Sequence, residues 1–298
     1  MSKLGFINLG LKWSLRYWQL LVLWYLFYLL SAVVLAILPA VGLLDFSRST
    51  AIRDLADGMD AWLLSDLLLG GLAGSPDAGQ GGPPSLNTGT SLSLLGLLVI
   101  LILLPLLAWL PAVFLSGGTL QTYAGAPGPF NFKQFLKECR AWFGLLIVLS
   151  LIELAGLALL VGAALLLLPL AFSFHQVLGY GLVFIFVLLL FLGLIFFDIS
   201  AAALVTSERR AIFPAFQSAF RTILGRPLTI FILFILALGL LILFHVVFRL
   251  GLFPLLPFSI WPLVLIAQQV FITLRLWTRL FRWAGGVEAV KAARPGFS

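Results

Sequence analysis

The chain has 298 residues, of which 62% are hydrophobic and only 10% are charged, and its mean hydropathy is +1.16. This composition excludes a water-soluble globule, because too few polar residues are present to cover a core of this size. The formal net charge of +7 therefore indicates attraction to an anionic membrane surface, and not to nucleic acid.

Six long apolar runs follow one another along the chain. They cover 17–44, 92–115, 144–170, 179–205, 228–250 and 259–280. Each can cross roughly 30 Å of hydrocarbon as a helix, whereas a β-barrel strand would alternate apolar and polar residues over about 10 positions. The sequence therefore predicts an all-α, polytopic bundle of six transmembrane helices in a single domain over 1–298. The first run is too long for a signal peptide and lacks a convincing cleavage site, so we expect it to be retained.

Lysine and arginine lie almost entirely on one side of these runs. Of the 18 basic residues, only Arg48, Arg53 and Arg249 lie on the other side. The remaining 15 are Lys3, Lys12, Arg16, Lys133, Lys137, Arg140, Arg209, Arg210, Arg221, Arg226, Arg275, Arg279, Arg282, Lys291 and Arg294. The positive-inside rule makes the basic side cytoplasmic. It predicts a multi-pass membrane protein with both termini in the cytoplasm and 281–298 as a cytoplasmic tail.

The segment 45–91 is predicted to be an outer loop in two parts. Within 48–69, apolar residues recur at helical spacing and predict an amphipathic helix; they are Ile52, Leu55, Met59, Trp62, Leu63 and Leu67. Residues 71–90 are rich in Gly, Pro and Ser, which is typical of a flexible linker.

A basic amphipathic stretch recurs three times, each time before an apolar run. The three stretches contain Leu11-Lys12 with Arg16 and Trp18, Leu136-Lys137 with Arg140 and Trp142, and Phe220-Arg221 with Arg226. This internal repeat predicts three pseudo-repeated hairpins, each preceded by an interfacial amphipathic helix along the inner leaflet. In the second stretch, Asn131 and Gln134 resemble a capping box that starts the helix.

The third stretch has its apolar stripe on one helical face and ends at Gly225, before Pro227. The stripe consists of Phe213, Phe216, Phe220, Ile223 and Leu224. We expect the basic residues of the second and third stretches to contact lipid headgroups; these are Lys133, Lys137, Arg140, Arg221 and Arg226. The alternative, that these helices only anchor and orient the spans, remains open.

Two carboxylates lie inside the predicted spans, where an ionised group is costly and is usually paired or functional. Glu153 and Asp198 are each about eight residues from the cytoplasmic end of their span, or roughly 12 Å deep. Gln268 and Gln269 lie at a comparable depth in the sixth run. The sequence predicts an intramembrane polar cluster of these four residues. The cluster either binds a cation or relays protons, or it only holds helices together.

The two histidines are weak candidates for axial ligands. His175 falls near the outer turn between the third and fourth runs, and His245 near the outer end of the fifth. Haem or chlorophyll ligation needs one His in an apolar pocket, and ordinary interfacial histidines are the alternative. The single cysteine, Cys139, excludes an intrachain disulfide and a cysteine metal cluster. We therefore predict no metal site and no cofactor.

Catalytic signatures are absent from the sequence. There is no G-x-x-x-x-G-K-[ST], no G-x-G-x-x-G after a strand, no H-E-x-x-H and no G-x-S-x-G, and no soluble stretch is long enough to form a catalytic domain. These absences favour a non-enzymatic protein.

The segment SERRAIFPAFQSAFRTILGRP, placed between two apolar runs, resembles the corresponding region of a broad group of uncharacterised bacterial six-helix membrane proteins. It is also similar to the membrane domain found beside some glycerophosphodiester phosphodiesterases, and the likeness is best over residues 117–250. Because the phosphodiesterase chemistry of those proteins resides in a separate soluble domain, the resemblance implies an accessory or lipid-proximal role. The resemblance also implies that the membrane is a bacterial cytoplasmic (inner) membrane. The outer loop at 45–91 departs from the compact loops of that pattern, because it is long and contains Asp45, Asp54, Asp57, Asp60, Asp66 and Asp77.

Three functional hypotheses remain. The first is a non-enzymatic integral membrane protein with an accessory, scaffold or lipid-interacting role, whose partners are membrane lipids. The second is a small cation- or proton-coupled permease that uses Glu153 and Asp198. The third is a subunit of a larger membrane complex, with other membrane proteins as partners and with His175 or His245 holding a pigment or haem.

Overall fold

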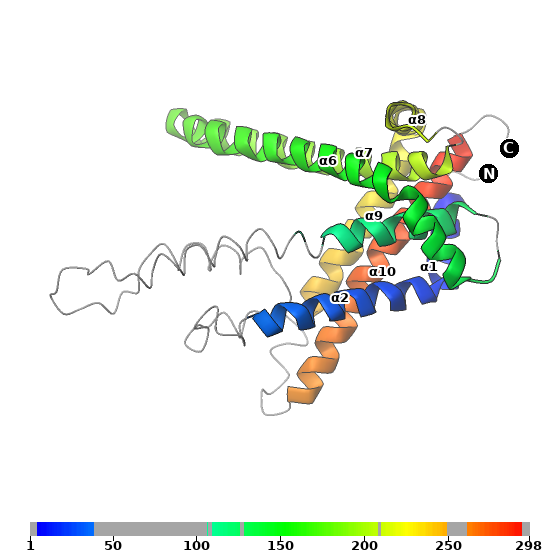
Figure 1. The fold of residues 1–298 in the computed structure, drawn as a ribbon. Coiled ribbons are helices and arrows are strands. Elements are labelled where there is room, and N and C mark those ends of the chain that lie inside the picture. Colours follow the sequence, from blue (N-terminus) through cyan, green and yellow to red (C-terminus); the bar gives the residue numbers. More distant parts are fainter. Residues whose placement is uncertain are drawn as a thin grey trace, which may run out of the picture. The chain divides into compact units, whose positions relative to one another are not determined.

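The computed structural model describes residues 5–38, 106, 109–125, 128–207, 210–248 and 261–293. Within these ranges the chain is helical and has no β-strand, which confirms the all-α class (Figure 1). The helices are α1 (Gly5–Arg16), α2 (Trp18–Leu38), α6 (Phe132–Phe174), α7 (Gln176–Thr206), α8 (Ile212–Gly225), α9 (Pro227–Val246) and α10 (Trp261–Ala293). A further helical stretch covers 109–124. The predicted outer loop at 45–91 lies outside the described residues.

Three helices, α6, α7 and α9, are long and apolar enough to cross a membrane. They fit the predicted class, a helical membrane protein. The described part of α2 adds a shorter apolar helix over Trp18–Val33. Most of the predicted run at 92–115 lies outside the described residues, so the number of six spans and the three repeated hairpins stay predictions.

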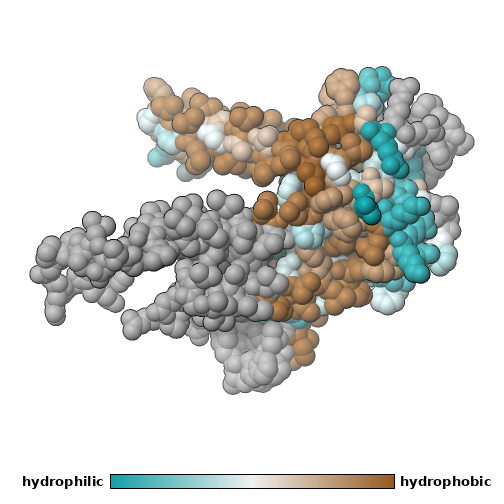
Figure 2. All heavy atoms as spheres, viewed as in Figure 1, coloured by the Kyte–Doolittle hydropathy of each residue, from teal (hydrophilic) through white to brown (hydrophobic). Residues whose placement is uncertain are grey.

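The chain divides into two compact units. Unit 1 contains Met1–Val22, Leu110–Ile242 and Leu276–Ser298, and unit 2 contains Leu23–Trp109 and Leu243–Arg275. Among the described residues, every Lys and Arg except Arg275 belongs to unit 1. Figure 2 shows hydrophilic residues gathered at the end of unit 1 where α1 and the last turns of α10 lie, whereas the α6–α7 hairpin is largely hydrophobic. The prediction of one transmembrane domain over 1–298 stays a prediction.

The C-terminal half of α10 contributes to the core of unit 1. Five of its apolar residues are buried: Leu280, Phe281, Ala284, Val287 and Val290. The helix α10 continues to Ala293 and so covers most of the predicted cytoplasmic tail at 281–298, whose location stays a prediction. Small and apolar residues repeat along this part of the helix at helical spacing, and burying them stabilises the helix against its neighbours.

A pair of glycines lets other helices approach α10 closely. A Cβ atom added to Gly10 would lie 2.9 Å from the Cα atom of Gly285, so the backbones of α1 and α10 are in contact. On the same helix, a Cβ atom at Gly285 would lie 2.7 Å from Leu233 of α9, and one at Gly286 would lie 3.4 Å from Ile199 of α7. Small residues at such crossings are typical of membrane helix packing.

Two basic side chains hold the end of α10 in place. The Lys291 ammonium donates to the carbonyl oxygen of Tyr123 at 2.8 Å and forms an ion pair with Glu288 at 3.0 Å. The Arg226 guanidinium, between α8 and α9, donates to the carbonyl oxygen of Ala292 at 3.0 Å. These contacts link the end of α10 to the helical stretch 109–124 and to the junction of α8 and α9.

The second amphipathic stretch is not a separate helix as we expected. It continues into the span as α6, a single helix of 43 residues that is about 64 Å long at 1.5 Å per residue. Its predicted start is correct, because the Asn131 side chain accepts from the backbone N–H groups of Lys133 and Gln134. Only Gly144 weakens the helix near the expected boundary, and one glycine costs about 1 kcal/mol. The other two stretches do end before the next helix: α1 and α2 separate at Tyr17, and α8 and α9 separate at Arg226, before Pro227.

Candidate functional site

Asp198 of α7 is bound by two side chains of α10. Its Oδ2 atom lies 2.6 Å from Nε of Arg282, and its Oδ1 atom accepts from the indole Nε1 of Trp283 at 3.1 Å. The Arg282 guanidinium also lies 5.5 Å from the ring centre of Phe234 in α9. Both charged side chains are mostly buried, with 27% of Arg282 and 20% of Asp198 exposed. These contacts join α7, α9 and α10 through one charge pair.

Glu153 of α6 belongs to the same neighbourhood. It is partly buried and lies within electrostatic range of Asp198, Arg279 and Arg282. The Arg279 guanidinium lies 4.6 Å from the ring centre of Trp283. The neighbourhood thus holds two carboxylates and two guanidinium groups, so its formal charge is balanced. Within this group Asp198 and Arg282 form an ion pair, whereas Glu153 forms none with a described Lys or Arg.

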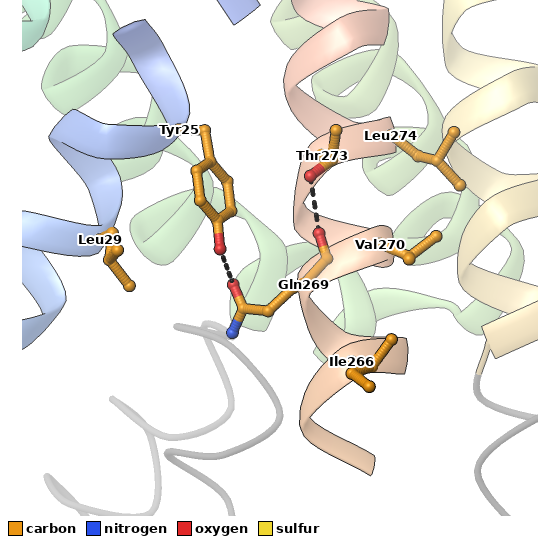
Figure 3. A pocket seen from close by; sticks show the side chains of 7 residues that line it. All are labelled: Tyr25, Leu29, Ile266, Gln269, Val270, Thr273 and Leu274. Carbon is orange, nitrogen blue, oxygen red and sulfur yellow. Dashed lines mark hydrogen bonds between the residues drawn. The ribbon is translucent and has the colours of Figure 1, made fainter. Parts of the chain in front are cut away.

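Gln268 and Gln269 belong to unit 2, whereas Glu153 and Asp198 belong to unit 1. Gln268 is buried, and the carbonyl oxygen of the Gln269 side chain accepts from the Tyr25 hydroxyl at 2.8 Å (Figure 3). This hydrogen bond lies on an open groove of about 580 Å³ between α2 and α10; its walls are Tyr25, Leu29, Ile266, Gln269, Val270, Thr273 and Leu274. The four-residue polar cluster therefore stays a prediction for its two glutamines.

Sequence reasoning missed Arg282 and Trp283 as partners of Asp198. Arg282 lies in the predicted tail, two residues after the end of the sixth apolar run at 280. Two signals were available in the sequence. A carboxylate inside a span is usually paired with a cation at the same depth. In addition, apolar residues alternate with Arg279 and Arg282, so the helical pattern continues beyond that run.

The histidines have local contacts. His175 separates α6 from α7 with an extended backbone, and its Nδ1 atom accepts from the backbone N–H of Val177 at 3.2 Å, which caps α7. His245, in unit 2, lies with its ring centre 5.7 Å from that of Phe271. Both side chains are exposed. Their role as axial ligands stays a prediction, and the described residues contain no group of three or more His, Cys, Asp or Glu that could hold a metal ion.

The three basic amphipathic stretches share one arrangement of exposed side chains. Each shows two apolar residues four positions apart, with a basic residue directly after at least the first of them. The apolar pairs are Leu11 with Leu15, Phe132 with Leu136, and Phe220 with Leu224, all of them exposed. The basic residues that follow are Lys12, Arg16, Lys133, Lys137 and Arg221. Residues four apart lie on one helical face, so each stretch presents a mixed apolar and cationic surface.

The opposite faces of these stretches are buried in unit 1. In α1 the buried residues are Gly10 and Ser14, and Tyr17, directly after this helix, is buried too; at the start of α6 they are Phe135, Cys139 and Trp142; in α8 they are Ala215, Ala219 and Thr222. Cys139 packs against Gly118, where an added Cβ atom would collide with its sulfur. Phe132 and Leu136 recur at helical spacing with Phe135, Cys139 and Trp142, but they are exposed, whereas these three are buried.

Of the basic residues predicted to meet lipid headgroups, Lys133, Lys137, Arg140 and Arg221 are exposed. Arg226 is exposed as well, but it also donates to the carbonyl of Ala292. Arg210 is not among the residues predicted to meet headgroups. Its side chain is exposed, and its guanidinium lies 4.9 Å from the ring centre of Trp142.

No protein-family model, no curated protein and no solved structure matches this chain.

Proposed function

We propose that this protein is a non-enzymatic integral membrane protein of a bacterial inner membrane, with an accessory or scaffold role that depends on membrane lipids. The observation that carries the proposal is the repeated exposed surface of α1, the start of α6, and α8, where apolar pairs lie beside basic residues. Apolar side chains next to cations match the boundary between acyl chains and anionic headgroups. The resemblance to membrane domains beside glycerophosphodiester phosphodiesterases is part of this proposal.

A purification from the native membrane in mild detergent tests the proposal. The bound lipids, the co-eluting proteins and the absorption spectrum are measured together. We expect a colourless protein that retains anionic phospholipids above their fraction in the membrane. A variant with glutamine at Lys12, Arg16, Lys133, Lys137, Arg140 and Arg221 should lose this enrichment. A matched variant that exchanges Lys for Arg and Arg for Lys at the same six positions should keep it.

A stoichiometric protein partner or a visible absorption band would contradict the proposal and favour the complex-subunit hypothesis. In that case His175→Ala and His245→Ala identify the ligand, because removing an axial ligand removes or shifts the band.

A proton- or cation-coupled permease is the second candidate. Asp198 is engaged by Arg282 and Trp283, which favours a structural role for this carboxylate. No described Lys or Arg forms an ion pair with Glu153, which is partly buried on α6. If the protein transports a cation, Glu153 is therefore the residue that should carry it. Ion flux into proteoliposomes that Glu153→Gln abolishes, with the variant still folded, would support this candidate over the first.

A further inference from the structure

We propose that the exposed side of α8 is a docking surface for an anionic phospholipid leaflet. In this proposal Phe213, Phe220 and Leu224 enter the acyl layer, while Arg210 and Arg221 bind phosphate groups. The inference rests on the lipid-dependent role proposed above and names the residues and the lipid class for one of its surfaces.

The packing of α8 leaves three of its bulky apolar residues exposed. The helix packs through small residues, since Ala215, Ala219 and Thr222 are buried. The next bulky residue, Phe216, lies against Phe196 and Phe197 of α7, with ring centres 5.4 and 6.2 Å away. On the other side, Phe213 is 79%, Phe220 57% and Leu224 62% exposed.

These three exposed residues form one stripe. With 3.6 residues per turn, Phe213, Phe220 and Leu224 fall within roughly 40° of one another around the helix axis, opposite the buried small residues. Exposure of three large apolar side chains to water is unfavourable, and their burial in an apolar environment stabilises the protein. The stripe therefore needs an apolar environment.

The direction of α8 suits a membrane surface. Figure 1 shows α8 nearly end-on, whereas the α6–α7 hairpin of the same unit runs across the view, so α8 crosses the hairpin. The helices of this hairpin are the longest apolar helices described. A helix that crosses them lies along the membrane plane when they span it.

The charges on this surface are positive. The 14 residues of α8 contain no Asp or Glu, and Arg221 is exposed beside Phe220. Arg210 lies just before the helix and is held over Trp142 of α6 at 4.9 Å. Trp142 is buried, so it fixes the aromatic surface on which Arg210 rests, and the guanidinium remains able to form hydrogen bonds with a phosphate.

An anionic leaflet fits this surface better than a second copy of the chain. The same face of a second copy would bring further arginines and no carboxylate from α8, and like charges repel. A leaflet offers acyl chains below its phosphates, which matches an apolar stripe flanked by arginines. Because the stripe and both arginines are exposed, replacing them should leave the packing of α8 on α7 intact.

The test uses the full-length protein in vesicles of phosphatidylcholine with a minor fraction of phosphatidylglycerol. After detergent-free extraction, lipid analysis gives the enrichment of phosphatidylglycerol around the wild type, R210Q/R221Q and F213S/F220S/L224S. We expect wild-type enrichment and an affinity for phosphatidylglycerol about 5-fold lower for each arginine removed. Gln217→Ser, on an exposed position of the same helix, is the matched control and should behave as the wild type.

A second measurement locates the stripe directly. In a Cys139→Ala background, a nitroxide attached to Phe220→Cys should collide more with oxygen than with a water-soluble nickel complex. If wild-type enrichment persists in R210Q/R221Q but disappears in K133Q/K137Q/R140Q, this inference is wrong and the proposed function stands. If the wild type shows no enrichment at all, both are wrong. A water-exposed nitroxide, or a protein bound over α8, also overturns the inference.

Discussion

At the scale of single residues, the charges inside unit 1 act as helix-to-helix contacts. Asp198 has a cation and an indole N–H as partners, both contributed by α10. A carboxylate away from water is stable only when its oxygens are paired in this way. The nearby glycines act at the same scale, because they remove the side chains that would keep α1 and α10 apart.

Removing the partner of Asp198 should destabilise the protein. We expect Arg282→Gln to lower the free energy of unfolding by about 1–3 kcal/mol, because a mostly buried carboxylate loses its ion pair. In a double-mutant cycle with Asp198→Asn, the two changes should couple by at least about 0.5 kcal/mol. The measurement is reversible unfolding in mixed detergent micelles, with the exposed Lys133→Gln as control. Additive effects would show that the pair contributes nothing.

Gly10 should not tolerate even a methyl group. We expect Gly10→Ala to lower stability by about 1–3 kcal/mol, because the added carbon would collide with the backbone of Gly285 and force the helices apart. Gly156→Ala is the matched control. No atom lies within 4 Å of its added Cβ, so the same change should be neutral or gain up to about 1 kcal/mol. Equal midpoints of thermal unfolding for Gly10→Ala and Gly156→Ala would argue against the close contact between α1 and α10.

At the scale of elements, the two longest described helices differ from the expected pattern. α6 combines an amphipathic stretch and an apolar span without interruption, and α10 continues 13 residues past the end of its apolar run at 280. Helix length here follows from what each face packs against. A charged or amphipathic stretch remains helical when its apolar side is buried, as it is for Cys139 and Val287.

The continuity of α6 predicts that the protein is sensitive to proline at Gly144, near the boundary that the sequence predicts between amphipathic helix and span. Gly144→Pro should destabilise the protein by about 3 kcal/mol, because proline removes a helical hydrogen bond and collides with the carbonyl of Arg140. Gly144→Ala, with no atom near its added Cβ, should be tolerated. Thermal unfolding in detergent distinguishes the two. If Gly144→Pro leaves the stability unchanged, the stretch before residue 144 is a separate interfacial helix, as the sequence predicts.

A truncation tests whether the end of α10 is a core element. A chain that stops after Arg275 loses the buried residues from Leu276 to Val290, and we expect it to aggregate, which size-exclusion chromatography in detergent detects. A chain that stops after Ala293 keeps α10 whole and should elute as the full-length protein does. If the shorter chain elutes normally, residues 276–293 are dispensable.

At the scale of the whole molecule, the distribution of charge predicts the topology. The described basic residues belong to unit 1 with the exception of Arg275, and the positive-inside rule assigns the span ends that carry them to the cytoplasm. These ends include α1, the start of α6, and α8, which are the three surfaces proposed to meet the inner leaflet.

Labelling of single cysteines in intact cells tests this topology. In a Cys139→Ala background, a membrane-impermeant maleimide should label Asp77→Cys in intact cells, because the loop at 45–91 is predicted to be outside. Lys137→Cys is exposed in unit 1 and should be labelled only after lysis. Labelling of both positions from one side would reject the predicted orientation. The native Cys139 is fully buried and should react only in denatured protein.

The sequence alone determined the class, the helical content and the candidate surfaces. Long apolar runs and the spacing of Lys and Arg are local properties, so Asn131 as a helix start and Gly225 as a helix end could be predicted from neighbouring residues. The tertiary structure decided which residues meet across the chain. Arg282 and Trp283 bind Asp198 from about 85 positions away, and Gly10 meets Gly285. Sequence periodicity can show that a face is apolar, but protein and lipid bury apolar groups equally well. Only the packing therefore separates the stripe of Phe213, Phe220 and Leu224, which points outward, from Ala215 and Ala219, which hold α8 in place.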